Sequence, residues 1–400
     1  MSSTIRQVLS RLVRLKTLPS DDRMLETNLK RSLSTVELIA VGTGNMIGSG
    51  LYVLTGVVAR DITGPAIIVS YAIAGIVALL AAVCFIEFCS YIPRTGSAYI
   101  FTYVVMGEIW AFLIGWNLIL EYVISVAAVG KTLSSFIDEL CGNAISNFTT
   151  EQIMRGRDLD LGFIEPYPDF VGVILVTLLS LFVIGGVSMS ARTMTLFLFI
   201  NITVICIFTI VGLRHADISN WRDYGGFAPY GVSGIVSGAG TLFYSYVGFD
   251  SIALSSEETT NPRKSIPAAT VTSLLIAAKG GHLIIQGDWY AILPLLLLQL
   301  AAVFSFLLIP LHYKAKTSEN YFTMKGVPLT PALSIVFDLV LLMKLETAAW
   351  IRFVVWVAIG LIVYFSYGYW HSLERGREET TQEDEHENQQ ASCASYGTLD

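Results

Sequence analysis

A cluster of glycines in the first apolar stretch is the earliest feature of the chain that can do chemistry. Gly42, Gly44, Gly48 and Gly50 fall within nine positions. Glycine disfavours a helix interior by about 1 kcal/mol relative to alanine, and close helix packing would explain Gly44 and Gly48 alone. The cluster therefore predicts a helix that is interrupted inside the membrane. Backbone N–H groups freed by such an interruption can bind an anion.

A second irregular stretch runs from Tyr244 to Asp250 in a later apolar run. An aspartate near the middle of a bilayer costs about 2.5–3.5 kcal/mol on insertion scales and is normally functional or paired. We therefore expect a second interrupted helix, five spans after the first. One helix end can hold a carboxylate, and freed carbonyls of the other can accept from an ammonium group. A molecule with both groups is an α-amino acid.

Three further carboxylates lie in or beside apolar stretches. Apolar residues surround Glu121, so we expect it to be protonated, paired or lined by water, as a candidate for proton coupling or cation attraction. Glu108, thirteen residues earlier, is either a solvated carboxylate at a span end or part of the same machinery. Glu87 precedes Arg94, and we expect it to form structural hydrogen bonds.

No arrangement in the sequence is typical of an enzyme. The five histidines are dispersed, so we predict no catalytic residue, no metal site and no cofactor. Five cysteines are too few and too scattered for a disulfide or zinc framework. The glycine-rich stretches lie in apolar runs and lack the strand–loop–helix setting of a phosphate-binding loop. A channel would need rings of polar residues, which isolated acids do not supply.

The composition is that of an all-α membrane protein. Charged residues make up 14% of the chain and hydrophobic residues 54%, whereas a soluble domain carries about 25% charged residues. The net charge of −7 is mostly local, because residues 374–400 hold eight acidic residues and two arginines. We therefore infer the lipid bilayer as a partner, and no nucleic acid.

Nine apolar runs approach the length of about 20 residues that crosses a bilayer. They cover residues 36–58, 65–91, 103–133, 170–187, 194–213, 233–254, 289–312, 331–345 and 350–369. A tenth, weaker run at 268–286 is interrupted by Lys279, Gly280 and Gly281. We expect it to cross the membrane, because otherwise every later loop inverts against its own charge.

The distribution of basic residues predicts the orientation. Seven of them precede the first run and place the N-terminus in the cytoplasm: Arg6, Arg11, Arg14, Lys16, Arg23, Lys30 and Arg31. The loop after the third run then falls outside, and its sequon predicts glycosylation of Asn147. The polar, basic start lacks the pattern of a cleavable signal peptide. We expect a cytoplasmic segment at 1–35, a core at 36–286, C-terminal membrane helices at 287–373 and an acidic, disordered, cytoplasmic tail at 374–400.

Several stretches of the chain resemble the cationic amino acid transporters of the APC superfamily. The longest lies at 48–60, and others lie at 93–99, 107–112, 115–120, 243–250, 257–262, 350–353 and 364–372. The resemblance covers roughly residues 32–275 and 287–373. It implies a LeuT-type fold of two inverted five-helix repeats, followed by extra C-terminal helices.

The resemblance also implies roles for individual residues. Amides of Gly48, Ser49 and Gly50 would hold a substrate carboxylate, and carbonyls near Met46, Tyr244 and Val247 would take its amino group. The Tyr244 ring would act as a gate, and Glu108 and Glu121 match acidic positions tied to transport. Asn201 takes the place of a lysine that many proton-coupled relatives carry, which argues against coupling through that position. The expected substrate site comprises Met46, Gly48, Ser49, Gly50, Tyr244, Val247, Gly248 and Asp250.

The chain departs from this family in length. After residues 266–267 it runs through 278–281 almost directly into what resembles the family's twelfth helix. Most of the second repeat, from part of the seventh helix through the eleventh, is therefore missing. We expect transport of arginine, lysine or ornithine-like amino acids by alternating access, across the plasma membrane or alternatively the lysosomal membrane. The alternative function is a non-transporting form that associates with a full-length transporter.

Overall fold

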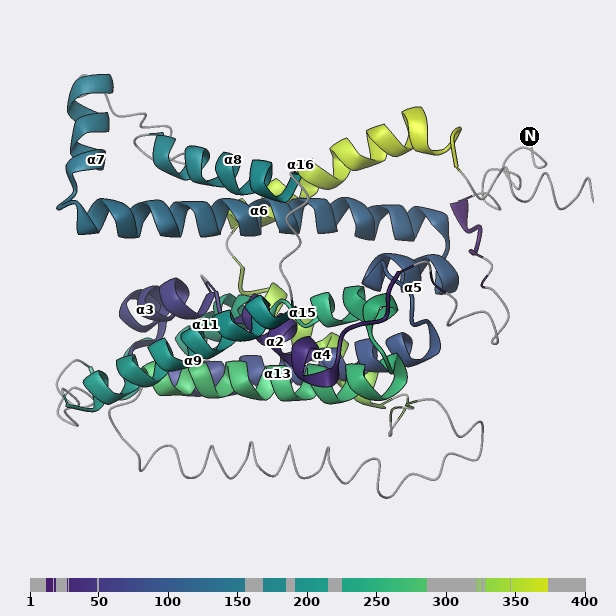
Figure 1. The fold of residues 1–400 in the computed structure, drawn as a ribbon, viewed down its shortest axis with the longest axis horizontal. Coiled ribbons are helices and arrows are strands. Elements are labelled where there is room, and N and C mark those ends of the chain that lie inside the picture. The colour runs from purple at the N-terminus through teal and green to yellow at the C-terminus, as the bar shows by residue number, and fades with distance from the viewer. Residues whose placement is uncertain are drawn as a thin grey trace, which may run out of the picture. The chain divides into compact units, whose positions relative to one another are not determined.

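The computed structural model describes residues 12–16, 18, 27, 29–48, 50–154, 168–184, 191–214, 225–285, 322, 324, 327, 329–345 and 347–372. The regular structure in this part of the chain is helical (Figure 1), apart from an isolated parallel bridge between Leu33 and Thr259. The all-α prediction is confirmed for these residues.

The described residues form a series of longer helices joined by short helical turns. The longer helices are α2 (Thr35–Met46), α4 (Ile67–Tyr91), α5 (Ser97–Val105), α6 (Glu108–Leu140), α8 (Phe170–Ile184), α9 (Ala191–Arg214), α11 (Gly231–Leu242), α13 (Pro262–Ile285), α15 (Leu329–Leu342) and α16 (Thr347–Val363). The shorter ones are η2 (Gly50–Leu54), α3 (Thr55–Val58), η3 (Ala59–Thr63), η4 (Gly64–Ala66), α7 (Ala144–Phe148), η5 (Thr149–Ile153), η6 (Phe243–Tyr246), α12 (Asp250–Leu254), η7 (Ser255–Glu258) and η8 (Tyr364–Gly368).

Four stretches of the described chain are helical, long and apolar enough to cross a membrane. They are Gly50–Tyr91, Glu108–Leu140, Thr195–Gly212 and Thr347–Gly368. The predicted spans 170–187 and 331–345 are the shorter apolar helices α8 and α15. The predicted span 289–312 lies outside the described residues. A helix of 25 residues such as α4 is roughly 37 Å long, which exceeds the hydrocarbon thickness of about 30 Å.

Two predicted segments have different limits in the structure. The span expected at 103–133 is two helices, α5 and α6, separated at Met106 and Gly107. Gly107 has a φ of +103°, and a Cβ there would lie 2.7 Å from the carbonyl carbon of Val13. The apolar run at 268–286 that Lys279, Gly280 and Gly281 interrupt belongs to one continuous helix, α13, which ends at Ile285 among the described residues. It begins earlier, at Pro262, since proline suits the first position of a helix.

The chain divides into two compact units. The first consists of Met1–Leu18, Ala98–Ile119 and Glu346–Asp400. Within it, the rings of Trp116 and Trp356 stack with centroids 4.6 Å apart. Each indole N–H donates to the other residue's carbonyl oxygen, at 2.9 and 3.1 Å. Gly360 leaves room for this pair, because a Cβ there would lie 2.5 Å from Trp116 Cδ1. Helix α16 is thereby fixed to the first part of α6.

The second unit consists of Pro19–Ser97 and Leu120–Leu345. Its core is formed mainly where α13 packs on α2 and α4, and where α11 packs on α4. Tyr71 and Tyr246 are buried there with their rings edge to face, and the Tyr246 hydroxyl donates to the Tyr71 carbonyl oxygen at 3.1 Å. Within a bilayer, van der Waals contact between closely packed helices stabilises such a core, and hydrogen bonds of this kind satisfy the polar atoms buried in it.

An N-terminal strap, defined as Thr27 and residues 29–34, pairs with the turn that follows α12. Backbone N–H groups of Ser32 and Leu33 donate to the Glu258 carbonyl oxygen at 2.9 and 3.0 Å, and Thr260 N–H donates to the Leu33 carbonyl oxygen at 3.1 Å. The Glu257 carboxylate accepts from the hydroxyl of Thr27 at 2.8 Å, and from the backbone N–H and hydroxyl of Thr95 at 3.0 Å each. The strap is therefore held by backbone and side-chain bonds together.

The environment of Glu257 predicts a pH-dependent stability. Burial alone would raise the pKa of Glu257, but hydrogen bonds from Thr95 and Thr27 and the charge of Arg94 outweigh it and lower the pKa below its usual value. This stabilisation is present above the unfolded pKa of about 4.3 and is lost as pH falls through the lower folded pKa. Glu257→Gln should therefore unfold at a lower temperature than the wild type at pH 7. The difference between the two unfolding temperatures, here called the gap, should become smaller below about pH 4.

Thermal unfolding of purified protein in detergent between pH 3 and pH 7 measures this gap. Glu258→Gln is the matched control, since its carboxylate is exposed on the neighbouring residue. A gap that stays constant over the whole range would contradict the prediction.

Candidate functional site at two paired helix breaks

The first helix is broken at the predicted position. A capping box opens α2, with the Ser34 backbone N–H donating to the Glu37 carboxylate at 2.8 Å. The helix ends at Met46, where Ile47 leaves the helical region with φ −81° and ψ 85°. Gly48 N–H donates to the Met46 carbonyl oxygen at 3.1 Å, and the Gly48 carbonyl oxygen accepts from Leu51. A helix resumes at Gly50, so the predicted interruption is confirmed.

The second break follows the same plan in a later helix. Helix α11 tightens into η6, which ends at Tyr246, and Val247 is extended with φ −66° and ψ 133°. Gly248 has a φ of +130°, a backbone conformation that residues with a side chain rarely adopt. Its carbonyl oxygen accepts from the Ser251 backbone N–H at 3.2 Å as α12 begins at Asp250. The second predicted interruption is also confirmed.

The two breaks pack directly against each other. A Cβ on Gly50 would lie 2.9 Å from Ser245 Cα and 3.1 Å from Tyr244 Cδ1. A Cβ on Gly248 would lie 3.0 Å from the Asn45 carbonyl carbon. Each break therefore carries a glycine where the other break approaches it. This proximity brings together the predicted residues Gly50 with Tyr244, and Gly248 with Met46. The predicted Gly48, Val247 and Asp250 lie within or next to the two breaks, whereas Ser49 lies outside the described residues.

This geometry gathers helix ends of both signs in one place. A helix carries partial positive charge at its N-terminus and partial negative charge at its C-terminus. The ends of α2 at Met46 and of η6 at Tyr246 are C-terminal, while the resumption at Gly50 and the start of α12 at Asp250 are N-terminal. A ligand with one cationic and one anionic group would find a complementary end for each.

Acidic and hydroxyl groups of the second unit gather beside the second break. The Tyr122 hydroxyl donates to Asp250 Oδ2 at 3.0 Å, and Glu121 is the residue next to Tyr122 in α6. The Tyr244 hydroxyl donates to Ser125 Oγ at 3.5 Å. Glu121, Tyr122 and Ser125 all belong to the α6 helix. The structure thus brings together the predicted Glu121 and Asp250 around a tyrosine.

Asn201 meets the resumed half of the first helix. The Tyr52 hydroxyl donates to Asn201 Oδ1 at 3.3 Å, which connects η2 to α9. Neither group carries a charge at neutral pH. The position therefore forms a neutral contact between these helices.

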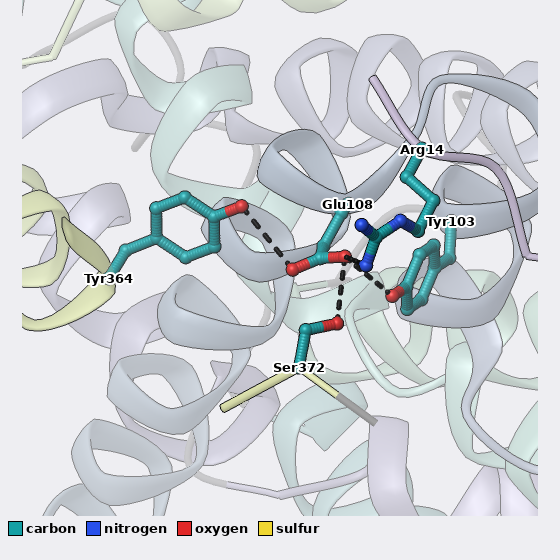
Figure 2. A network of polar contacts seen from close by, with 5 residues as sticks. All are labelled: Arg14, Tyr103, Glu108, Tyr364 and Ser372. Carbon is teal, nitrogen blue, oxygen red and sulfur yellow. Dashed lines mark hydrogen bonds and ion pairs between the residues drawn. The ribbon is translucent and has the colours of Figure 1, made fainter. Parts of the chain in front are cut away.

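Glu108 lies in the first unit, where four side chains converge on its carboxylate (Figure 2). It is 8% exposed and accepts from the hydroxyls of Ser372 at 2.9 Å, Tyr103 at 3.1 Å and Tyr364 at 3.4 Å. The guanidinium of Arg14 lies 3.6 Å away. A solvated carboxylate, one of the two expectations for this residue, is therefore wrong. Glu108 joins the N-terminal segment, α5, α6 and the end of the C-terminal helix.

Sequence reasoning missed the residues that complete these contacts. Tyr122 and Ser125 are three positions apart in α6 and so lie on one helix face. Polar residues at that spacing in an apolar run are a usable signal. The partners of Glu108 lie in segments far apart in the sequence, so no local pattern could have shown them.

Comparison with known proteins decides the family. The model of the family described as amino acid permease matches residues 37–281, and that of its C-terminus matches residues 322–372. The chain belongs to the amino acid permease family. A human protein named cationic amino acid transporter 4 is 46% identical over 285 residues, which are 71% of this chain and 44% of that protein. This permease is thereby placed among the cationic amino acid transporters of the APC superfamily, as the sequence motifs predicted.

Other relatives of this permease carry different names. A Bacillus subtilis protein named methylthioribose transporter is 38% identical over 250 residues, or 62% of this chain and 52% of that protein. An Arabidopsis thaliana protein named cationic amino acid transporter 4, vacuolar, is 34% identical over 253 residues, or 62% of this chain and 41% of that protein. The permease thus spans about half the length of the curated relatives that it matches.

Proposed function

We propose that this permease binds an L-amino acid at the paired helix breaks and moves cationic or related amino acids across a membrane by alternating access. The observation that carries the proposal is the direct packing of the breaks through Gly50 and Gly248. Amides of Gly48, Ser49 and Gly50 would hold the substrate carboxylate, in keeping with the N-terminal helix end at Gly50. The Gly48 N–H would exchange its bond to the Met46 carbonyl oxygen for the substrate. Carbonyls near Met46, Tyr244 and Val247 would accept from its ammonium group.

A cationic side chain suits the carboxylates beside the second break. Asp250 is bound by Tyr122, whose neighbour in the sequence is Glu121, and a cation beside two carboxylates favours their ionised forms. Arginine, lysine and ornithine-like substrates carry such a cation. We assign Glu121 a role in cation attraction or proton coupling, and Tyr244 a role as a gate next to Gly50. The names of the transport proteins related to this chain support transport over enzymatic activity.

Uptake by proteoliposomes tests the transport proposal. Purified protein is reconstituted, and radiolabelled arginine, lysine and alanine are offered from outside. We expect saturable uptake of arginine and lysine above that of empty vesicles, with weaker uptake of alanine. Uptake equal to that of empty vesicles would contradict transport by this chain.

A second candidate function is a non-transporting form that associates with a full-length transporter. It is favoured by the 44% coverage of the human relative and by the end of the first family match at residue 281. Alternating access requires two repeats that move against each other, and most of the second is missing. Co-purification of differently tagged copies of this chain and a full-length relative, together with failed uptake by this chain alone, would support this function over transport.

The proposed topology predicts glycosylation of Asn147. This residue is exposed on the short helix α7, after the α6 span, in a loop that we place outside the cytoplasm. We expect a mobility shift on treatment with a glycosidase that removes N-linked glycans, and no shift for Asn147→Gln. Asn143→Gln, exposed on the same loop outside a sequon, should behave as the wild type. A wild-type chain without the shift would contradict this topology. We propose the plasma membrane as its location, with the lysosomal membrane as the alternative.

A further inference from the structure

Helix α2 precedes the first break and helix α12 follows the second break, and these two inner halves contact each other at both of their ends. At the breaks, Gly248 meets Asn45, and further along Gly42 meets Ile252. At the other end, the strap that precedes α2 pairs with the turn that follows α12, through the bridge of Leu33 with Thr259. Helices α2 and α12 therefore form one paired body, with a close backbone approach at the breaks and backbone hydrogen bonds at the strap.

The Glu257 carboxylate connects this paired body to a third segment. Its Oε2 accepts from Thr27 on the strap, and its Oε1 accepts from the backbone N–H and hydroxyl of Thr95. Thr95 lies in the turn between α4 and α5. Each half of one carboxylate therefore binds a different segment. The neighbouring Glu258 is exposed and takes part through its backbone carbonyl oxygen, so the two adjacent acids have separable roles.

The hydrogen bonds that Glu257 accepts and the charge of Arg94 favour the ionised form of this carboxylate. Arg94, next to Thr95, acts on Glu257 electrostatically, and Arg31 on the strap donates to the Thr259 carbonyl oxygen at 3.1 Å. Hydrogen bonds to an ionised acceptor are stronger than those between neutral groups. The arrangement is thus strong while Glu257 is charged and is weakened by removing one charge.

We propose that Glu257 is a latch that holds the paired inner halves α2 and α12 against the α4–α5 turn, and that its release frees them to move. The latch rests on the proposed transport function, because a movement of these halves would open the site toward the side that the basic residues mark as cytoplasmic. Glu257 acts as a positioning residue, remote from the substrate. Ser256 next to it is 1% exposed, so the latched turn is packed on one side and exposed on the other.

Hydrogen exchange of the purified full-length chain tests the latch without any substrate. Amides of Ser32, Leu33 and Thr260 report on the strap, and amides of α4 and α13 report on global opening. In Glu257→Gln we expect the strap amides to exchange at least about tenfold faster, since the hydrogen bonds of Thr27 and Thr95 lose a charged acceptor. Amides of α4 and α13 should accelerate much less, in step with the lower unfolding temperature of this variant. Glu258→Gln should match the wild type. Thr95→Val, which loses the hydroxyl bond but keeps the backbone N–H bond to Glu257, should accelerate strap exchange less than Glu257→Gln does. Thr95→Ser, which keeps the hydroxyl, should exchange as slowly as the wild type.

Two results would overturn the latch. One is strap exchange in Glu257→Gln equal to that in Glu258→Gln. The other is equal acceleration in α4 and α13, which would show a general loss of stability. Because exchange is measured without arginine, a chain with the expected pattern but without uptake keeps the latch as a structural connection and contradicts transport.

Discussion

Gly248→Val is expected to destabilise the folded protein by about 3 kcal/mol, the sum of backbone strain and overpacking at one site. A valine there would have to keep a φ of +130°, a backbone angle that residues with a side chain rarely adopt. Its Cβ would also lie 3.0 Å from the Asn45 carbonyl carbon and 3.1 Å from Asn45 Cβ. The breaks would have to separate, so we expect arginine binding to be lost together with stability. The midpoint of chemical unfolding in mixed micelles measures the first effect.

Gly44→Ala is the matched control for this substitution. Gly44 lies in α2, and a Cβ there meets nothing within 4 Å. Alanine favours a helix by about 1 kcal/mol over glycine, so the variant should be at least as stable as the wild type. Equal stability of Gly248→Val and Gly44→Ala would contradict the close packing of the breaks.

Glu108→Ala is expected to destabilise the protein by about 3–5 kcal/mol, the usual loss when one partner of a buried ion pair is removed. The side chains of Arg14 and Glu108 are 9% and 10% exposed. The variant would remove the Glu108 carboxylate from the buried Arg14 guanidinium, and three hydroxyls would lose an acceptor. Chemical unfolding again measures the loss.

Two further variants separate the charge from the hydrogen bonds. Glu108→Gln keeps an acceptor but removes the charge, so its loss should be intermediate. Glu139→Ala removes an exposed carboxylate from the same helix α6 and should change stability by less than about 0.5 kcal/mol. If Glu108→Ala and Glu139→Ala have the same free energy of unfolding, the hydrogen bonds and the ion pair of Glu108 contribute no stability, and the prediction is contradicted.

The helix breaks could be predicted because their cause is local. Glycines at Gly42 to Gly50 and the sequence around Gly248 disfavour a continuous helix wherever they stand. In the structure the breaks begin after Met46 and at Val247, within the two stretches where the sequence predicted them. The division between α5 and α6 was missed, although Gly107 marks it. Gly107 is needed there because the backbone near Val13 approaches it closely, and such an approach between distant segments leaves no pattern in the sequence.

Most of the contacts that the sequence did not predict are hydrogen bonds between segments that lie far apart in the sequence. Glu108 looked like a carboxylate at a span end, and its burial results from Tyr364 and Ser372, more than 250 positions later. Glu257 looked like part of a family motif, while Thr27 and Thr95 make it a connection between segments. Asp250 was predicted to be functional because an aspartate in the membrane costs free energy. The structure added its hydrogen-bond donor, the Tyr122 hydroxyl.

Equilibrium binding of radiolabelled L-arginine to the purified chain tests the central claim that the two breaks form one amino-acid site. Gly50→Ala places a Cβ 2.9 Å from Ser245 Cα, whereas Gly56→Ala in α3 meets nothing within 4 Å. We predict saturable binding by the wild type and by Gly56→Ala, displaced by unlabelled lysine and lost in Gly50→Ala. Absence of saturable binding by the wild type, or equal binding by Gly50→Ala and Gly56→Ala, would contradict the claim.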